Sequence, residues 1–423
     1  MSLAEQMMRR VAEPAVLRWY SWRGDPVARW MRPESKHDPY PMYADIRQRG
    51  LVHSGLGPWV TASHATASAV LRDRRFSSSP VHQRGYRPPH YPPGDPRADL
   101  AAADLLTLDP PDHTRIRRLV SGTFTPKAIA GLEPFIRDTA GRLLDEAAAA
   151  DGFDLIDDVA FPLPIAVICH LLGVPAQDQD SFRTWGHDVA ATLEPQTASA
   201  ARTQTREAEL ALSGYLRDLV ARRRADPDDS LMSALIAAEE EGDRLTPAEL
   251  VSTALLLLVA GFETTVNLIG NGTVALLSEH GGQEQWQRLR EEPALVPGAV
   301  EELLRFDSPV QMTSRIATQD AEVDGTLVRQ GTPVIVAIGG ANRDPGVFDE
   351  PAQLMIDRPN ASSHLSFSLG IHHCLGAALA RLEGRIAIEE LTRRCPRLTL
   401  AGTPVRRPLL VLRGYEHIPV RAA

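Results

Sequence analysis

The stretch that decides the fold is Phe367-Ser368-Leu369-Gly370-Ile371-His372-His373-Cys374-Leu375-Gly376, which precedes a helix-like run from Ala377 to Ile388. A single cysteine lies here between a glycine four positions before it and another two positions after it. Because the thiol precedes a helix, backbone N–H groups and the positive end of the helix dipole are expected to favour its thiolate form. Taken alone, the stretch therefore indicates either a metal ligand or a nucleophile.

The composition is that of an ordinary globular protein, with 43% hydrophobic and 23% charged residues in a chain of 423. Its 45 basic and 54 acidic residues give a formal charge of −9, which argues against general nucleic-acid binding. The three cysteines (Cys169, Cys374 and Cys395) are too few and too widely spaced for a disulfide framework. The longest apolar run, Ala254 to Phe262, is too short to span a bilayer, and the N-terminus lacks the apolar core of a signal peptide. We therefore expect a cytoplasmic protein without a transmembrane anchor.

Residues 1–36 are rich in arginine and tryptophan, and they include Arg9, Arg10, Trp19, Trp22 and Trp30. One interpretation is an interfacial amphipathic helix that touches a membrane or a partner. The other, which we prefer, is a surface helix that caps the fold with its aromatic side chains packed inward.

Residues 77–108 form a loop rich in proline, tyrosine and histidine. So long a loop in a compact protein is usually functional or mobile, so a wall of a binding site and a mobile surface loop both stay open. Pro110-Pro111-Asp112-His113 then begins a helix on which His113 and Arg117 share a face.

The periodicity of the sequence predicts mostly helices with a small β-region. Helices are expected at 41–49, from 63, at 126–149, 161–171, 176–193 and 196–224; strands near 52, at 59–61 and within 310–338; an irregular meander at 342–359; and a short strand pair within 409–420.

The longest predicted helix begins at Thr246-Pro247-Ala248-Glu249, a capping box with proline at the first helical position, and runs to about Glu279. Its length of roughly 50 Å is unusual for a globular protein. Ala260-Gly261-Phe262-Glu263-Thr264-Thr265 lies in its apolar centre, where a carboxylate costs several kcal/mol unless it is paired or hydrated. Thr264 is able to bond back to the carbonyl one turn earlier and loosen the helix. A helix crossing built from small residues is the alternative, but so many unfavourable choices together favour a functional role.

Three spaced motifs resemble those of the cytochrome P450 family. Phe367-x-x-Gly370-x-x-x-Cys374-x-Gly376 matches its haem-binding signature, Ala260-Gly261-x-Glu263-Thr264-Thr265 its oxygen-activating helix, and Glu302-x-x-Arg305 its E-x-x-R motif. Without the other two motifs, the pairing of Glu302 with Arg305 would not indicate a function. The resemblance covers the chain from about Pro41 to the C-terminus. Within the family, the chain resembles soluble actinobacterial members. Ser368 stands where many bacterial members have glycine.

The resemblance implies a mainly α triangular prism with a small β-rich region, formed by one catalytic domain of residues 37–423 after an extension of residues 1–36. It implies haem b with Cys374 as the axial iron ligand, Gly370 and Gly376 close to the sulfur, and Phe367 shielding it. His113, Arg117, Arg315 and His372 match positions that bind the haem propionates. Glu263 and Thr264 match the acid–alcohol pair that handles protons. Glu302, Arg305 and Arg358 match a buried ion network that holds the haem loop.

The activity that the resemblance implies is a monooxygenase that uses O2 and two external electrons to hydroxylate or epoxidise a lipophilic small molecule. No flavin or iron–sulfur segment is visible, so we expect electrons from NAD(P)H through a ferredoxin reductase and a ferredoxin. Arg115, Arg118, Arg381 and Arg385 form the expected basic docking face for an acidic ferredoxin. The loop at 77–108, the connection at 185–200 and Val310-Gln311-Met312 are expected to line the substrate pocket.

Other assignments fit the sequence less well. A haem-thiolate peroxygenase would replace the acid–alcohol pair by Arg-Pro, and a haem-binding sensor would need neither Glu263 nor Thr264. A cysteine hydrolase would pair Cys374 with His372 or His373, although neighbours in one loop rarely form a nucleophile–base pair. A zinc site built from His364, His372, His373 and Cys374 lacks the usual ligand spacing.

Overall fold

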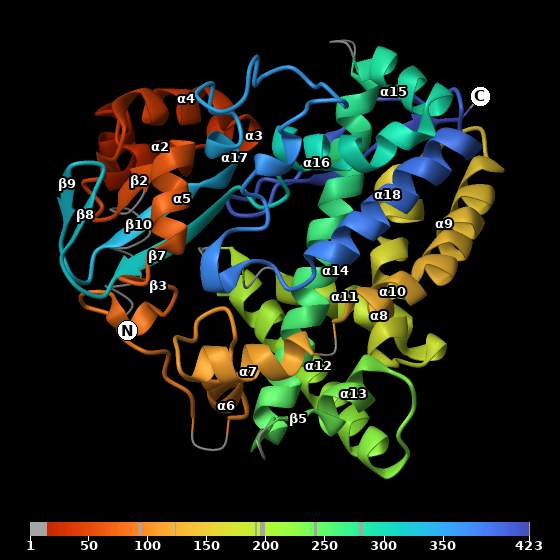
Figure 1. Ribbon diagram of the computed structural model, residues 1–423, viewed down its shortest axis with the longest axis horizontal. Helices are drawn as coiled ribbons and strands as arrows, with labels where there is room; N and C mark the ends of the chain where they lie inside the picture. The colour runs from red at the N-terminus through yellow and green to blue at the C-terminus, as the bar shows by residue number, and fades with distance from the viewer. Residues whose placement is uncertain are drawn as a thin grey trace.

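The structure is a computed structural model that describes residues 15–92, 95–122, 124–190, 193–194, 199–240, 243–278 and 282–422. Expectations that concern Arg9, Arg10, Glu279 and most of 191–198 lie outside the described residues. Helices dominate the molecule, and a small sheet lies to one side of them (Figure 1). The predicted mainly α class is therefore confirmed.

The helices follow one another along the whole chain, and residues 15–22 are also helical. They are α2 Pro26–Trp30, α3 Pro33–His37, α4 Tyr40–Arg49, α5 His64–Arg72, α6 Arg97–Ala102, α7 Asp112–Ser121, α8 Pro126–Gly131, α9 Glu133–Ala148, α10 Pro162–Leu172, α11 Gln179–Ala190, α12 Ser199–Ala225, α13 Leu231–Ala237, α14 Pro247–Leu277, α15 Gly282–Glu291, α16 Val296–Phe306, α17 Ile338–Ala341 and α18 Ala377–Arg394.

The strands are short and belong to several small sheets. They are β1 Val52–His53, β2 Trp59–Thr61, β3 Phe76–Ser77, β4 Phe153–Asp154, β5 Glu239–Glu240, β6 Asp243–Arg244, β7 Met312–Ala317, β8 Ala321–Val323, β9 Thr326–Val328, β10 Pro333–Ala337, β11 Thr399–Leu400, β12 Val405–Arg406, β13 Tyr415–His417 and β14 Pro419–Arg421.

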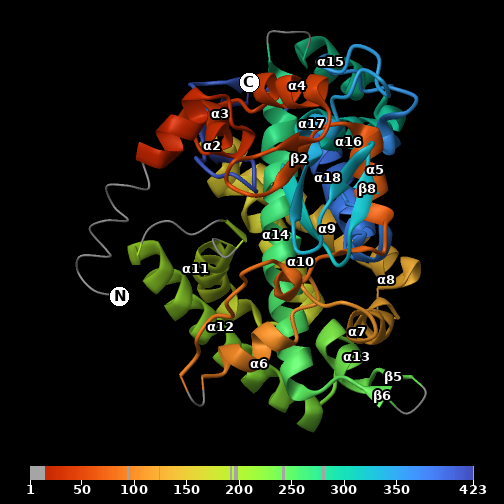
Figure 2. The same ribbon diagram turned by 90° about the vertical axis from the view of Figure 1, so that its left-hand side faces the viewer.

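Helix α14 is the axis of the molecule and runs through its full height in Figure 2. The predicted capping box is present: the Thr246 hydroxyl accepts from the Glu249 N–H, and the Glu249 side chain accepts from the Thr246 N–H. Helices α10, α11, α12, α16 and α18 pack against it. Among the described residues, α14 alone is long and apolar enough to cross a membrane, but 72% of its most apolar window is buried inside the protein. It is therefore a core helix.

The main sheet has the strand order β1-β2-β10-β7-β3. β10 pairs with β2 in parallel (Val334 opposite Trp59) and with β7 antiparallel (Val334 opposite Arg315). Val334 and Val336 are fully buried and face a second hydrophobic cluster, while α5 and α17 pack at this side. The β-region predicted between Val310 and Ile338 is thus confirmed, and its central strand pair fixes the position of Arg315.

The strand pair predicted within 409–420 is wrong. β13 pairs with β12, and β14 pairs with β11 and β4, so the two C-terminal strands do not pair with each other. Residues 410–412 form no strand because their backbone N–H groups donate to the carboxylate of Glu194. Such a side-chain acceptor was invisible in the local sequence pattern.

The N-terminal aromatic side chains pack inward only in part. Trp30 is buried and contacts Tyr43 edge to face, with ring centroids 5.3 Å apart, and α2 packs against α4. Trp19 and Trp22, in contrast, have 49% and 81% of their surface exposed, which corrects our expectation. Arg23 lies over the Trp19 ring at 4.7 Å, so this ring is covered by a cation instead of by the core. The boundary between residues 1–36 and 37–423 stays a prediction.

Candidate functional site

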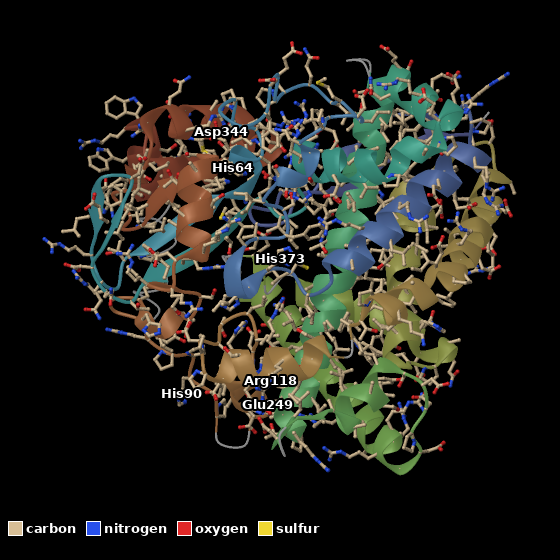
Figure 3. The ribbon with its side chains drawn as sticks, viewed as in Figure 1. His64, His90, Arg118, Glu249, Asp344 and His373 are labelled. Carbon is tan, nitrogen blue, oxygen red and sulfur yellow. The ribbon has the colours of Figure 1, made fainter. Side chains whose placement is uncertain are left out.

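The loop that carries Cys374 is a set of tight turns before α18. The Ser368 N–H donates to Leu365 O (2.8 Å), and the Cys374 N–H donates to Phe367 O (2.9 Å). Gly370 has φ +73°, and a Cβ there would lie 2.5 Å from the carbonyl oxygen of Leu71 at the end of α5. Glycine is therefore required at this position for both conformation and space. In Figure 3 the loop lies near the middle of the view, where His373 is labelled.

Two opposing effects act on the Cys374 thiol. Burial raises its pKa above the ordinary value, whereas the Gly376 N–H and the guanidinium groups of Arg117 and Arg381 lower it. The N–H group at the helix start acts in the expected direction, but desolvation is the largest effect in the protein part of the site. The residue is nevertheless accessible. A thiol that is surrounded by protein and still accessible borders an internal space.

Phe367 and Gly376 flank this thiol. Arg381 lies over the Phe367 ring at 4.5 Å, and the ring of His373 is 6.4 Å from it. Gly376 caps α18, and a Cβ added to it would meet no atom within 4 Å. Unlike Gly370, Gly376 is therefore not required by contacts with the protein itself.

Three chain segments place imidazole and guanidinium groups close to this loop. His113 of α7 and His372 have ring centroids 4.4 Å apart, and Arg315 of β7 donates weakly to the hydroxyl of Ser368 (3.5 Å). Arg117, one turn after His113, donates to the backbone oxygen of His373. We call His113, Arg117, Arg315 and His372 the basic cluster. The sequence separates its members by as much as 259 positions, and the fold brings them together.

Within the basic cluster His113 and Arg315 are buried, Arg117 and His372 are half-buried, and several nitrogens lack partners. Both ring nitrogens of His113 and Nε2 of His372 have no hydrogen-bond partner, and His113 is only 2% exposed. Burial lowers the pKa of Arg315 to about 10, and no carboxylate among the described residues pairs with it. Burial, with help from Arg315, His113 and Arg117, lowers the pKa of His372 to about 3. Buried polar groups are normally satisfied, so this arrangement lacks an anionic ligand.

Helix α14 contributes the acid and the alcohols. Glu263 is fully buried, and Thr264 is partly accessible. The Thr264 hydroxyl donates to Ala260 O (2.7 Å) and that of Thr265 to Gly261 O (2.9 Å), as the sequence predicts for hydroxyls in a helix. Leu257, Ala260 and Thr264 form a partly accessible strip, whereas residues 265–273 are all buried. The strip is therefore a face of the core helix that the described residues cover only in part.

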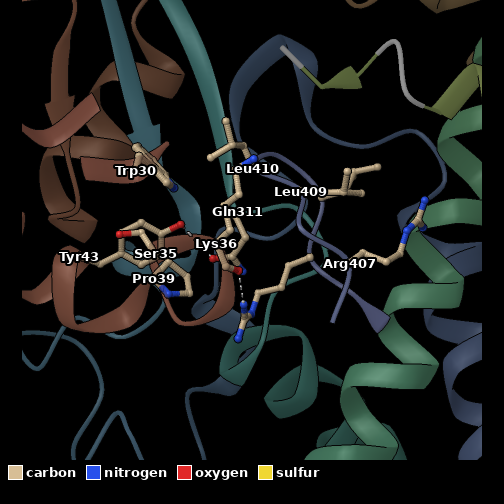
Figure 4. A pocket seen from close by; sticks show the side chains of 11 residues that line it. Trp30, Ser35, Lys36, Pro39, Tyr43, Gln311, Arg407, Leu409 and Leu410 are labelled. Atoms are coloured by element: carbon tan, nitrogen blue, oxygen red, sulfur yellow. Dashed lines mark hydrogen bonds between the residues drawn. The ribbon is translucent and has the colours of Figure 1, made fainter. Parts of the chain in front are cut away.

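The partner of Glu263 was missed by sequence reasoning. Its Oε1 accepts from the guanidinium of Arg407, and its Oε2 is buried without a partner. Arg407 belongs to the C-terminal segment, 144 positions away, and no local pattern connects the two residues. Figure 4 shows the Arg407 side chain pointing away from Gln311 and Leu410 toward α14.

Glu302, Arg305 and Arg358 form one ion network, and all three are buried. Glu302 Oε2 accepts from Arg305 Nε (2.6 Å) and from Arg358 Nε (3.0 Å), while Oε1 accepts from Arg305 Nη2 (2.7 Å). The remaining guanidinium hydrogens go to backbone oxygens of the meander, including Pro351 O and Gln353 O. No buried side-chain atom of these three residues lacks a partner, so the network joins α16 to the meander completely.

The expected basic docking face is largely neutralised within the chain. Arg115 pairs with Asp243 and Glu249, Arg381 with Glu301, and Arg385 with Glu133 and Glu389. Counting arginines in the sequence therefore overstated the positive charge of this surface, because carboxylates from other elements were not considered.

Two of the alternative sites are not formed. Among the described residues, the only group of three side chains close enough to hold a metal is Asp154, Asp157 and His417, which does not include the zinc ligands considered above. In the same part of the chain, no hydrogen bond joins the Cys374 sulfur to His372 or His373, as a nucleophile–base pair would require.

Comparisons with known proteins agree with the geometry. Residues 90–408 match the family model described as Cytochrome P450. The chain is 41% identical over 395 residues to a vitamin D(3) 25-hydroxylase of Pseudonocardia autotrophica (90% of this chain, 93% of the relative) and 39% identical over 397 residues to the 6-deoxyerythronolide B hydroxylase of Saccharopolyspora erythraea (91% and 96%). The solved structure of the cytochrome P450 PksS of the bacillaene polyketide synthase of Bacillus subtilis 168 superposes with a TM-score of 0.85 at 35% identity, covering 93% of this chain and 99% of that one. This chain therefore belongs to the cytochrome P450 family and is a haem-thiolate monooxygenase that hydroxylates a small molecule.

Proposed function

We propose that haem b occupies the space between α14 and the loop of Cys374, with the Cys374 thiolate as the protein ligand of its iron. The observation that carries the proposal is the basic cluster, whose buried nitrogens lack partners beside an accessible cysteine. Two propionate carboxylates would supply the missing acceptors for His113, Arg315 and His372, and Arg117 would complete the pair of salt bridges. Gly376, where an added Cβ would meet no atom within 4 Å, and Phe367 would flank the sulfur of the ligand.

The bound haem would supply the activation of O2 and the insertion of one oxygen atom into a substrate C–H bond or double bond. The chain's own part is to hold protons and exclude water. Thr264 donates its hydroxyl hydrogen to Ala260 O, so its oxygen stays able to accept a hydrogen bond from a water molecule in the accessible strip. Glu263 is the only ionisable side chain in that central helix turn, and its Oε2 is unoccupied. We assign proton holding to this pair, with Glu263 as the acid.

The partly accessible strip on α14 favours a lipophilic substrate. Leu257, Ala260 and the neighbouring Leu256 present carbon to this space, and Leu409 and Leu410 lie on the segment that carries Arg407. The relatives named above act on vitamin D(3) and on 6-deoxyerythronolide B. We therefore place the substrate among apolar molecules of moderate size. Gln311 is not a simple pocket residue, because it bonds to Tyr43 (3.1 Å) and to Ser308 O (2.7 Å).

Electrons would come from NAD(P)H through a ferredoxin reductase and an acidic ferredoxin. The docking face would include Arg118 and Arg381, although the pairing of Arg381 with Glu301 reduces its long-range field. Reversing the charge of both arginines is expected to slow reduction by ferredoxin, with a steeper effect at low salt. Unchanged reduction rates would remove this face from the proposal. The buried free thiols of Cys169 and Cys395 fit the reducing cytoplasm that we propose as its location.

The decisive experiment is the absorption spectrum of the reduced, CO-bound protein. We expect the red-shifted Soret band of thiolate-ligated haem in the wild type and its loss in Cys374→Ala. Retention of that band in the variant would overturn the assignment of Cys374. A screen of steroids and macrolactones for low-to-high spin shifts would then identify the ligand class.

A further inference from the structure

The C-terminal segment 407–412 connects two carboxylates that lie on different elements. Glu194 stands on the chain between α11 and α12, and Glu263 stands in the centre of α14. Neither acid has a sequence neighbour that would suggest a shared function. Each of the two carboxylates nevertheless contacts segment 407–412.

Glu194 binds the main chain of the segment. Its Oε2 accepts from the Leu410 N–H (2.8 Å), and its Oε1 accepts from the N–H groups of Val411 (2.9 Å) and Leu412 (2.8 Å). Three charge-assisted hydrogen bonds from consecutive amides fix both the position and the conformation of the segment. This replaces the strand pairing that these residues would otherwise need.

Arg407 carries the contact onward to α14. Its own main chain is fixed by two hydrogen bonds, from the Arg407 N–H to Gly414 O (3.1 Å) and from the Leu409 N–H to Arg407 O (2.9 Å). Its guanidinium pairs with Glu263 Oε1, and the side chain is only 16% exposed. The same short segment is therefore held at its main chain by one carboxylate and holds a second carboxylate through its side chain.

The pairing is one-sided with respect to Glu263. Arg407 occupies Oε1 and leaves Oε2 buried without a partner. Arg407 orients the carboxyl group and supplies a positive charge beside this buried position. The free oxygen is the one that is left to bond to water.

We infer that Arg407 is a positioning residue for Glu263, and that Glu194 acts through segment 407–412 to hold Arg407 in place. The inference rests on the proposed role of Glu263 as the proton-holding acid. It adds that the orientation of this acid depends on a residue between α11 and α12, far from it in sequence.

The test uses the haem-loaded enzyme with the compound that gives the largest spin shift in the screen above. Arg407→Gln is expected to lower kcat about tenfold with KM within about twofold, and to raise the share of electrons recovered as hydrogen peroxide. Arg407→Lys should restore most of the coupling because it keeps the positive charge. Arg406→Gln is the matched control, since the neighbouring arginine pairs with Asp307 and not with Glu263. Equal peroxide yields in Arg407→Gln and Arg406→Gln would overturn the inference.

Glu263→Gln separates this inference from the proposed function. If Glu263→Gln leaves peroxide yield and kcat unchanged, the proposed role of Glu263 itself fails. If it lowers coupling, Arg407→Gln should add nothing further in that background, because both substitutions remove the same function. An additional loss there would show that Arg407 acts by another route.

The link through Glu194 has a readout that does not depend on turnover. Glu194→Ala should accelerate amide hydrogen exchange at 410–412 at least about tenfold, since these amides lose their acceptor. It should also raise the peroxide share, and the double variant with Arg407→Gln should be no worse than Arg407→Gln alone. Unchanged exchange at 410–412, or additive effects in the double variant, would remove Glu194 from the relay.

Discussion

The ion network is a buried group of charged side chains and the basic cluster is a partly buried one, and the two differ in how well their polar atoms are satisfied. In the network of Glu302, Arg305 and Arg358, no buried side-chain atom lacks a hydrogen-bond partner within the chain. In the basic cluster, His113 and His372 leave buried nitrogens unpaired. A saturated polar group stabilises the fold by itself, whereas an unsaturated one needs a ligand to offset its desolvation. This difference supports our proposal that the basic cluster, and not the network, holds the haem.

The largest effect is expected from breaking the saturated network. Glu302→Leu leaves Arg305 and Arg358 buried without a counter-charge, which should lower the free energy of unfolding by about 3–5 kcal/mol. Denaturant unfolding of the haem-loaded protein measures it. Glu301→Leu is the matched control, because the adjacent Glu301 is more exposed (17%) and pairs with Arg381 and His364 at the edge of the core, so a smaller cost than that of Glu302→Leu is expected. Equal costs for the two variants would contradict the view that saturation makes the network structural.

Truncation of a side chain in the basic cluster should affect the retention of haem more than the free energy of unfolding. His113→Ala removes a buried ring whose nitrogens have no hydrogen-bond partner in the chain, so it should lower the free energy of unfolding of the haem-free protein by less than Glu302→Leu does. Haem retention should fall about tenfold to a hundredfold, the effect usual for groups that support a bound metal centre. Competition for haem with apomyoglobin measures the retention. His170→Ala, an exposed histidine stacked on Phe135 at 3.9 Å, should leave retention unchanged. A large loss of apo stability in His113→Ala would make the cluster structural.

A single unpaired carboxyl tests whether one unsatisfied atom is enough to mark a ligand site. Glu383 of α18 is 3% exposed, its Oε2 has no partner, and burial raises its pKa well above the ordinary range. Its stabilising contribution is therefore complete below the pKa of the unfolded chain and is lost as the pH rises through the folded pKa. Glu383→Gln, which is neutral at every pH, should stabilise the protein by about 1–3 kcal/mol at neutral pH relative to the wild type and by little near pH 4.

Haem content gives the second readout of this variant. Because Glu383 stands alone, Glu383→Gln should not change haem retention. A parallel loss of retention would mean that isolated unsatisfied groups also report ligand contacts. A stability difference that is the same at both pH values would contradict the assigned direction of the pKa.

The long helix and the β-region were predicted because each follows from local signals, whereas the assignment of Cys374 as the haem ligand came from the resemblance to the family. A capping box, a period-two pattern and a glycine with φ +73° are all encoded within a few residues. The pairing of Arg407 with Glu263, the capture of residues 410–412 by Glu194 and the neutralisation of Arg115 and Arg381 are different. Each depends on the side chain of another element, so only the packed fold determines it. The same limit explains why Trp22 was expected inside.

The smallest effect concerns backbone strain, which occurs once in each of the two regions. Ser368 in the cysteine loop has φ +58°, and Glu350 in the meander beside the network has φ +43°. The left-handed region costs a residue other than glycine roughly 1–2 kcal/mol, and glycine loses about 0.5–1 kcal/mol of this gain through unfolded-state entropy. Ser368→Gly and Glu350→Gly should therefore each stabilise by about 0.5 kcal/mol in denaturant unfolding.

The two substitutions should diverge in what they do to the haem. Glu350 contributes its backbone oxygen to Arg358, which glycine keeps, so haem retention should not change. Ser368 places its hydroxyl 3.5 Å from Arg315, and its loss frees that guanidinium from a weak local acceptor. If Arg315 binds the haem and is not held by the cysteine loop, Ser368→Gly should keep or slightly raise the retention of haem. A fall in retention in Ser368→Gly alone would show that the hydroxyl orients Arg315, and that the basic cluster is less open than its unpaired nitrogens indicate.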